Sequence, residues 1–144
     1  NSGFLVTRTL LAQKGQRPET FFSRFFFTYA HRNVIRAVAS GLAASGSVDG
    51  YVYEVVAGIE PSLTQRTRIL RRSELLGFPP IAAPRVPIDE ARLSSLTNAL
   101  LTMRSDPDGR IVLDMLWLDG FSAEQPALFD SIAAKAALVA QQAG

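Results

Sequence analysis

The sequence contains no cysteine and a single histidine, His31. The absence of cysteine excludes disulfide bonds, thiolate metal sites and cysteine nucleophiles. One histidine without carboxylates clustered at ligand spacing argues against a zinc site. We therefore expect no metal ion, and we expect no cofactor.

The sequence also lacks long apolar runs and dense basic runs. No uninterrupted apolar stretch approaches the roughly 20 residues needed to cross a bilayer, and the first residues lack the basic, apolar and small-residue order of a signal peptide. The arginines form no dense basic run with interleaved aromatic residues, so nucleic acid is not an expected partner.

The composition is that of one globular domain with a core: 144 residues, of which 47% are hydrophobic and 19% are charged. The charge is unevenly distributed. Residues 1–76 hold ten Lys/Arg against five Asp/Glu, whereas residues 77–144 hold five against eight. The positive excess of the first half is either solvated surface or a site for an anionic ligand or partner.

Strand-like segments alternate with helical patterns in the first half of the chain, and helical patterns follow to the end. This order predicts an α/β fold with a mainly parallel sheet. We expect strands at residues 25–30, 47–49 and 66–73, a proline-punctuated extended segment at 77–87, and helices that begin after the caps Ser2, Asp89 and Asp106.

Five stretches occur in an order that is typical of one family: "NSGFLVTRTLL", "AHRNVIRAVASG", "GSVDGYVYE", "RILRRSELLGFPPIAA" and "DPDGRIVLDMLWLDGF". Together they resemble the later part of the phosphate/phosphonate-type solute-binding proteins of ABC transporters. The resemblance implies the C-terminal portion of a type 2 periplasmic-binding-protein fold. Residues 1–76 would form the second, ligand-binding lobe, residues 77–86 a hinge or crossover, and residues 87–144 the C-terminal helices that return to the first lobe.

The resemblance also implies a ligand site. In the family, a turn ending in Ser-Gly starts a helix that binds the phosphonate or phosphate group, and a histidine at a strand-to-helix junction faces the ligand. Helix N-termini suit anions, and the same dipole favours a neutral imidazole that donates one directed hydrogen bond. The residues implied to bind ligand are Asn1, Ser2, Gly3, His31, Asp49, Tyr51 and Ser73.

Structural roles stay open for some of these residues. His31 could cap its helix or satisfy a neighbouring backbone group, and Asp49 could cap the helix that begins near Gly50. The sequence also departs from the family pattern. Residues 29–32 replace Gly-Ser-His-Asp, and residues 43–46 replace Ala-Asp-Ala-Gly. The loss of two carboxylates and the gain of Arg32 would make the site more basic.

These features predict a protein that is not an enzyme. We expect a periplasmic or otherwise extracytoplasmic solute-binding component of an uptake system, which holds a small oxyanion of the phosphonate or phosphate class between two lobes and presents it to an ABC permease. The alternatives are an extracytoplasmic sensing domain of a signalling kinase, or an enzyme similar to the pyrimidine synthases of thiamine biosynthesis, which carry a cysteine-rich motif.

The resemblance implies that the opening part of the first lobe is not among these residues. We therefore expect residues 1–144 alone to bind ligand weakly or not at all. We also expect homo-oligomers that form through the surfaces left uncovered.

Overall fold

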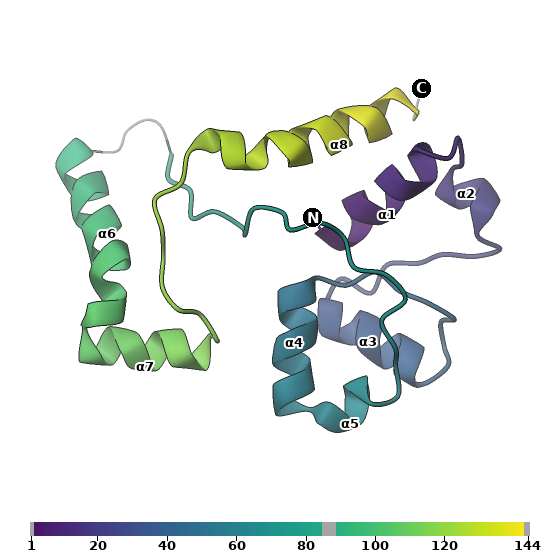
Figure 1. Ribbon diagram of the computed structural model, residues 1–144, viewed down its shortest axis with the longest axis horizontal. Helices are drawn as coiled ribbons and strands as arrows, with labels where there is room; N and C mark the ends of the chain where they lie inside the picture. Colours follow the sequence, from purple (N-terminus) through teal and green to yellow (C-terminus); the bar gives the residue numbers. More distant parts are fainter. Residues whose placement is uncertain (1, 85–88, 143–144) are drawn as a thin grey trace. The chain divides into compact units, whose positions relative to one another are not determined.

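The computed structural model describes residues 2–84 and 89–142 (Figure 1). Asn1 and two residues of the predicted hinge, 85 and 86, lie outside the described residues. The chain divides into two compact units, residues 1–76 with 129–144, and residues 77–128. The helices are α1 (Ser2–Ala12), α2 (Pro18–Phe21), α3 (His31–Ala39), α4 (Gly50–Ile59), α5 (Pro61–Thr64), α6 (Glu90–Thr102), α7 (Pro107–Met115) and α8 (Asp130–Gln141), with two 3₁₀ helices, η1 (Met103–Ser105) and η2 (Pro126–Phe129).

The predicted α/β fold with a mainly parallel sheet is wrong, because the described residues contain helices and no β-strand. The three segments predicted as strands lie largely outside the helices but form no ladder with one another. The segment at 25–30 is also interrupted, since Tyr29 adopts a left-handed backbone with φ of 58°. Apolar patterning reports a local preference for extended backbone, whereas a strand requires a neighbour for its backbone hydrogen bonds.

Helix α1 is followed by a turn that contains a glycine, Gly15. Gly15 has a φ of 65°, in the region that glycine enters without steric cost. The N–H of Gln16 donates to the carbonyl of Leu11 at 2.9 Å, and that of Gly15 donates to Ala12 at 3.0 Å. These two bonds form a Schellman motif, which satisfies carbonyls that the helix end would otherwise leave without partners.

Helices α3, α4 and α5 pack together in the first unit. Helix α3 buries Ile35, Ala37 and Ala39, and α4 buries Val56. The loop between these helices passes very close to α3 at Gly46, where an added Cβ would overlap the Cγ1 atom of Val34. This packing fixes where α3 and α4 begin relative to each other.

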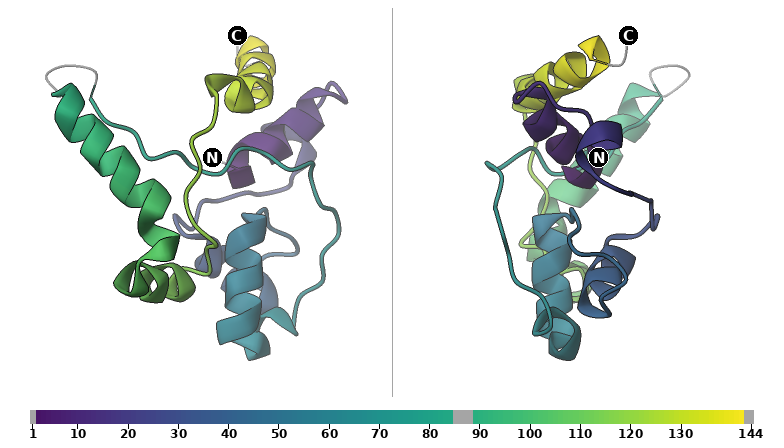
Figure 2. Two further views of the ribbon diagram at one scale, coloured as in Figure 1. Left: turned by 60° about the vertical axis from the view of Figure 1, so that its left-hand side comes forward. Right: turned by 90° about the vertical axis from the view of Figure 1, so that its right-hand side faces the viewer.

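Helix α8 lies beside α1 in the first unit (Figures 1 and 2). The two helices meet at their C-terminal ends, where the Nε2 group of Gln142 donates to the carbonyl of Ala12 at 2.9 Å. An ion pair between Lys135 and Glu74 connects α8 to the extended segment that follows α5. Helix α8 therefore contacts two segments that are distant from it in the sequence, α1 and the extended segment after α5.

The Glu74–Lys135 pair predicts a small pH dependence of stability. The hydrogen bond from Lys135 is the largest cause that lowers the pKa of Glu74 from its ordinary value of 4.5. A lowered folded-state pKa adds stability that is complete above the ordinary pKa and is lost as pH falls through the lowered one. Thermal unfolding across this acid range should show the loss in the original protein and a smaller loss in Glu74→Gln. Equal pH profiles for both proteins would contradict the assignment.

The second unit is built around α7. Asp106 caps α7 by accepting a hydrogen bond from the N–H of Gly109 at 2.7 Å, and Asp89 caps α6 through Ala91 at 3.0 Å. Leu113 of α7 is only 1% exposed. Gly109 touches η1 so closely that an added Cβ would overlap the carbonyl oxygen of Met103. The two caps were predicted from the sequence, whereas the close approach at Gly109 was not.

Candidate functional site

Three helices of the first unit begin close together: α1, α3 and α4. A Cβ added to Gly3 of α1 would lie 3.0 Å from the carbonyl oxygen of Ser47 and 3.5 Å from Cε1 of His31. The backbone N–H of Asp49, just before α4, donates to Nδ1 of His31 at 3.2 Å. The sequence therefore brings Gly3, His31 and Asp49 together from three separate segments.

The hydrogen bond from Asp49 determines the form of the His31 imidazole. Because Nδ1 accepts a backbone N–H, it carries no proton, and the ring is the neutral tautomer with its proton on Nε2. His31 is half-buried, and the bond from Asp49 orients its ring and hence this proton. His31 thus satisfies a neighbouring backbone group through Nδ1. That its Nε2 donates one directed hydrogen bond to a ligand stays a prediction.

The start of α3 has no side-chain cap, because the N-cap residue is Ala30. No acidic residue occurs in the first turn of α3 or of α1. The positive ends of these two helix dipoles are therefore not offset by a carboxylate from their own first turns. Such an end can bind the oxygen atoms of an anion through its backbone N–H groups.

Asp49 is the N-cap of α4. Its carboxylate accepts hydrogen bonds from the N–H groups of Tyr51 at 3.0 Å and Val52 at 3.4 Å. The capping role that the sequence left open is thus present. The carboxylate of Asp49 offsets the positive end of the α4 dipole, whereas its backbone N–H orients His31.

Replacing Asp49 tests its capping role through the stability of the protein. Asp49→Ala should lose the cap and destabilise the protein by about 0.5–2 kcal/mol, whereas Asp49→Asn should retain most of the stability. Urea unfolding measures both values. A loss of stability in Asp49→Asn as large as in Asp49→Ala would contradict the capping account.

The other predicted ligand-binding residues differ in position. Ser2 is the first residue of α1, and Asn1 lies outside the described residues. Tyr51 is half-buried in the first turn of α4. Ser73 is exposed, and its hydroxyl donates to the adjacent carbonyl of Glu74 at 2.8 Å. The hydroxyl of Ser73 is thus engaged locally, whereas Gly3, His31, Asp49 and Tyr51 lie at the three helix starts.

Arg32 does not add a free positive charge to this group, contrary to the sequence-based expectation. Its Nε and Nη2 atoms donate to the same carboxylate oxygen of Glu60 at 2.9 Å and 2.6 Å. Both side chains are partly exposed, at 48% for Arg32 and 33% for Glu60. Arg32 and Glu60 are 28 positions apart, so no local pattern predicts the contact, and sequence reasoning missed Glu60.

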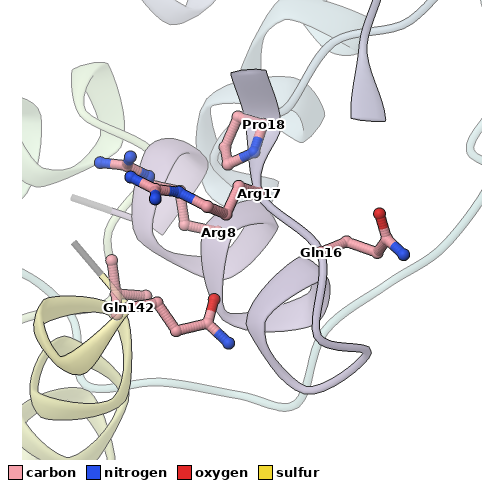
Figure 3. A pocket seen from close by; sticks show the side chains of 6 residues that line it. Arg8, Gln16, Arg17, Pro18 and Gln142 are labelled. Atoms are coloured by element: carbon pink, nitrogen blue, oxygen red, sulfur yellow. The ribbon is translucent and has the colours of Figure 1, made fainter. Parts of the chain in front are cut away.

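Two hollows lie beside α1. One is lined by Arg8, Gln16, Arg17, Pro18, Val139 and Gln142 (Figure 3). Its volume of about 10 Å³ leaves room for little more than a water molecule. The second, of about 190 Å³, is lined by Phe4, Arg8, Glu19, Phe25 and Phe27. There the Arg8 guanidinium lies 4.9 Å from the centre of the Phe4 ring and 3.3 Å from a Glu19 oxygen. Arg8 is thus already paired with a carboxylate.

Residues 2–84 and 89–142 contain no group of three or more His, Asp or Glu side chains that could hold a metal ion. Within the same ranges, every helix is too short or too polar to cross a bilayer.

Most of the chain matches a family of known proteins. A family described as "ABC transporter, phosphonate, periplasmic substrate-binding protein" matches residues 1–129. The match includes α1, α3, α4 and the residues at their starts. A search of curated proteins found no significant match.

Proposed function

We propose that this chain, which belongs to the periplasmic substrate-binding proteins of phosphonate ABC transporters, binds a phosphonate or phosphate group at the starts of α1, α3 and α4. The family is one of substrate-binding proteins and not of enzymes, and its periplasmic description supports a location outside the cytoplasm. The hydrogen-bond donors at the site support a tetrahedral oxyanion as the class of ligand.

One observation carries the proposal. The N–H of Asp49 bonds to Nδ1 of His31, which leaves the ring proton on Nε2, and Cε1 of the same ring lies 3.5 Å from a Cβ added at Gly3, at the start of α1. A tetrahedral oxyanion has several oxygen atoms that accept hydrogen bonds. The Nε2 donor and the backbone N–H groups at the starts of α1 and α3 could supply such bonds from different directions. Neutral donors bind an anion without requiring a buried cation.

Binding would be coupled to hinge closure. In this proposal residues 77–86 form the hinge, residues 1–76 with α8 supply the ligand-binding lobe, and the residues from 87 to 128 contribute to the other lobe. Ligand bound at the helix starts would favour the closed arrangement, because the second lobe then adds contacts that the open form lacks. The closed form would be presented to an ABC permease.

Exposed aromatic side chains support self-association of the chain. The exposed fractions of Phe21, Phe25, Phe26 and Phe27 lie between 43% and 55%. Burying such side chains against a second copy would be favourable. Sedimentation velocity of the 144-residue chain should show a species larger than a monomer. A single monomeric boundary at high concentration would rule self-association out.

Calorimetry on the full-length gene product tests the ligand class. Methylphosphonate or inorganic phosphate should bind more tightly than acetate, because a planar carboxylate offers fewer oxygen atoms to donors arranged around a tetrahedral group. Absence of binding for both tetrahedral ligands would contradict the proposed function. Equal binding of acetate would contradict the tetrahedral site.

A further inference from the structure

The starts of α1, α3 and α4 carry few ionisable side chains. In residues 2–5, 30–34 and 49–53, the charged residues are Arg32 and Asp49. The carboxylate of Asp49 caps α4 through the N–H groups of Tyr51 and Val52. The charge that this site presents to a ligand therefore depends strongly on Arg32.

Glu60 holds the guanidinium of Arg32 with two hydrogen bonds to one oxygen atom, at 2.9 Å and 2.6 Å. Arg32 follows His31 directly at the start of α3, whereas Glu60 follows the last residue of α4. His31 bonds toward the start of α4, and Arg32 bonds toward its end. The pair therefore draws the positive charge of Arg32 toward the end of α4, away from the start of α4 where Asp49 meets His31, and neutralises it.

The remaining positive potential comes from helix dipoles. Helix α1 and helix α3 have no acidic residue in their first turns, and α3 has no side-chain cap. Each such helix start is equivalent to roughly half an elementary charge, so the two together supply about one positive charge. Asp49 offsets the corresponding charge of α4. A total of about one positive charge matches a singly charged oxyanion better than a doubly charged one.

We propose that Glu60 sets the charge selectivity of the site by holding Arg32, so that the protein prefers singly charged over doubly charged tetrahedral oxyanions. This inference rests on the proposed function, because it assigns the charge class of ligand at the same helix starts. Glu60 is a specificity-determining residue that acts through Arg32. It does not itself contact the ligand.

Releasing Arg32 should change the binding free energy in proportion to ligand charge. A guanidinium free to turn toward the helix starts attracts a dianion about twice as strongly as a monoanion at the same distance. At the separations and screening of a partly exposed site, Glu60→Gln should increase affinity about tenfold for a dianion and about threefold for a monoanion. The preference for the monoanion should therefore fall by about threefold.

The test compares two ligands with the full-length gene product in one alkaline buffer. Methylphosphonate is doubly charged there, and its monomethyl ester is singly charged. Calorimetry gives both dissociation constants for the original protein, Glu60→Gln, and the double variant Arg32→Gln/Glu60→Gln. The original protein should prefer the ester, Glu60→Gln should shift toward methylphosphonate, and the double variant should return toward the original ratio.

A matched control comes from Glu54, an acidic residue within α4. Glu54 pairs with Arg72 at 2.9 Å, and Glu54→Gln changes the net charge by the same amount without releasing Arg32. This control should leave the ratio of the two affinities unchanged. Equal changes for both ligands in Glu60→Gln, or the same ratio shift in Glu54→Gln, would overturn the inference while leaving the proposed function intact. Failure of the original protein to bind either ligand would overturn both.

Discussion

His31→Ala is expected to weaken methylphosphonate binding by about tenfold to one hundredfold. A hydrogen bond from a neutral donor to a charged acceptor contributes about 1.5–3 kcal/mol, which corresponds to this range. The variant removes the Nε2 donor that the bond from Asp49 holds in position. Calorimetry on the full-length gene product measures the loss.

Two conservative variants distinguish the donor from the orienting nitrogen of His31. His31→Gln places an amide nitrogen near the former Nε2 position, whereas His31→Asn places its amide near the former Nδ1 position. His31→Gln should therefore retain more affinity than His31→Asn. Equal affinities for all three variants and the original protein would show that the His31 side chain does not contact the ligand.

Gly109→Ala is expected to destabilise the second unit by about 1–3 kcal/mol, despite the higher helix propensity of alanine. The new Cβ would overlap the carbonyl oxygen of Met103 and lie 2.8 Å from the Cγ atom of Met103. A backbone carbonyl cannot move aside as a flexible side chain can, so α7 and η1 would have to separate. Urea unfolding of the 144-residue chain, followed by the fluorescence of its single tryptophan, Trp117, reports on this unit.

Gly50→Ala is the matched control for Gly109→Ala. Gly50 is also helical, and an added Cβ there has no neighbour within 4 Å. This substitution should therefore be neutral or slightly stabilising. Similar losses of stability in the two variants would contradict the role of close packing at Gly109.

Local features could be predicted from the sequence because their causes lie within a few residues. The caps of α6 and α7 depend on Asp89 and Asp106 and on N–H groups two or three positions later. The end of α1 depends on the left-handed backbone at Gly15. Such short-range hydrogen bonds leave a residue pattern that can be read directly.

Contacts between residues that are far apart in the sequence leave no local residue pattern. The predicted sheet failed because alternating or apolar runs do not identify a partner strand, and Tyr29 interrupts one of these runs with a positive φ. The Arg32–Glu60 pair joins residues 28 positions apart, and Glu60 balances the positive charge that Arg32 adds. The meeting of Gly3, His31 and Asp49 was implied by family resemblance rather than by spacing.

The proposed site depends on His31 as a neutral donor whose Nε2 proton faces a tetrahedral oxyanion. Nitrogen NMR of the imidazole in the full-length gene product, with signals assigned through His31→Gln, tests this claim with and without methylphosphonate. The spectra should show a proton on Nε2, an unprotonated Nδ1, and a shift of the Nε2–H signal when ligand saturates the protein. A proton on Nδ1, or an Nε2–H signal that saturating methylphosphonate leaves unchanged, would contradict it.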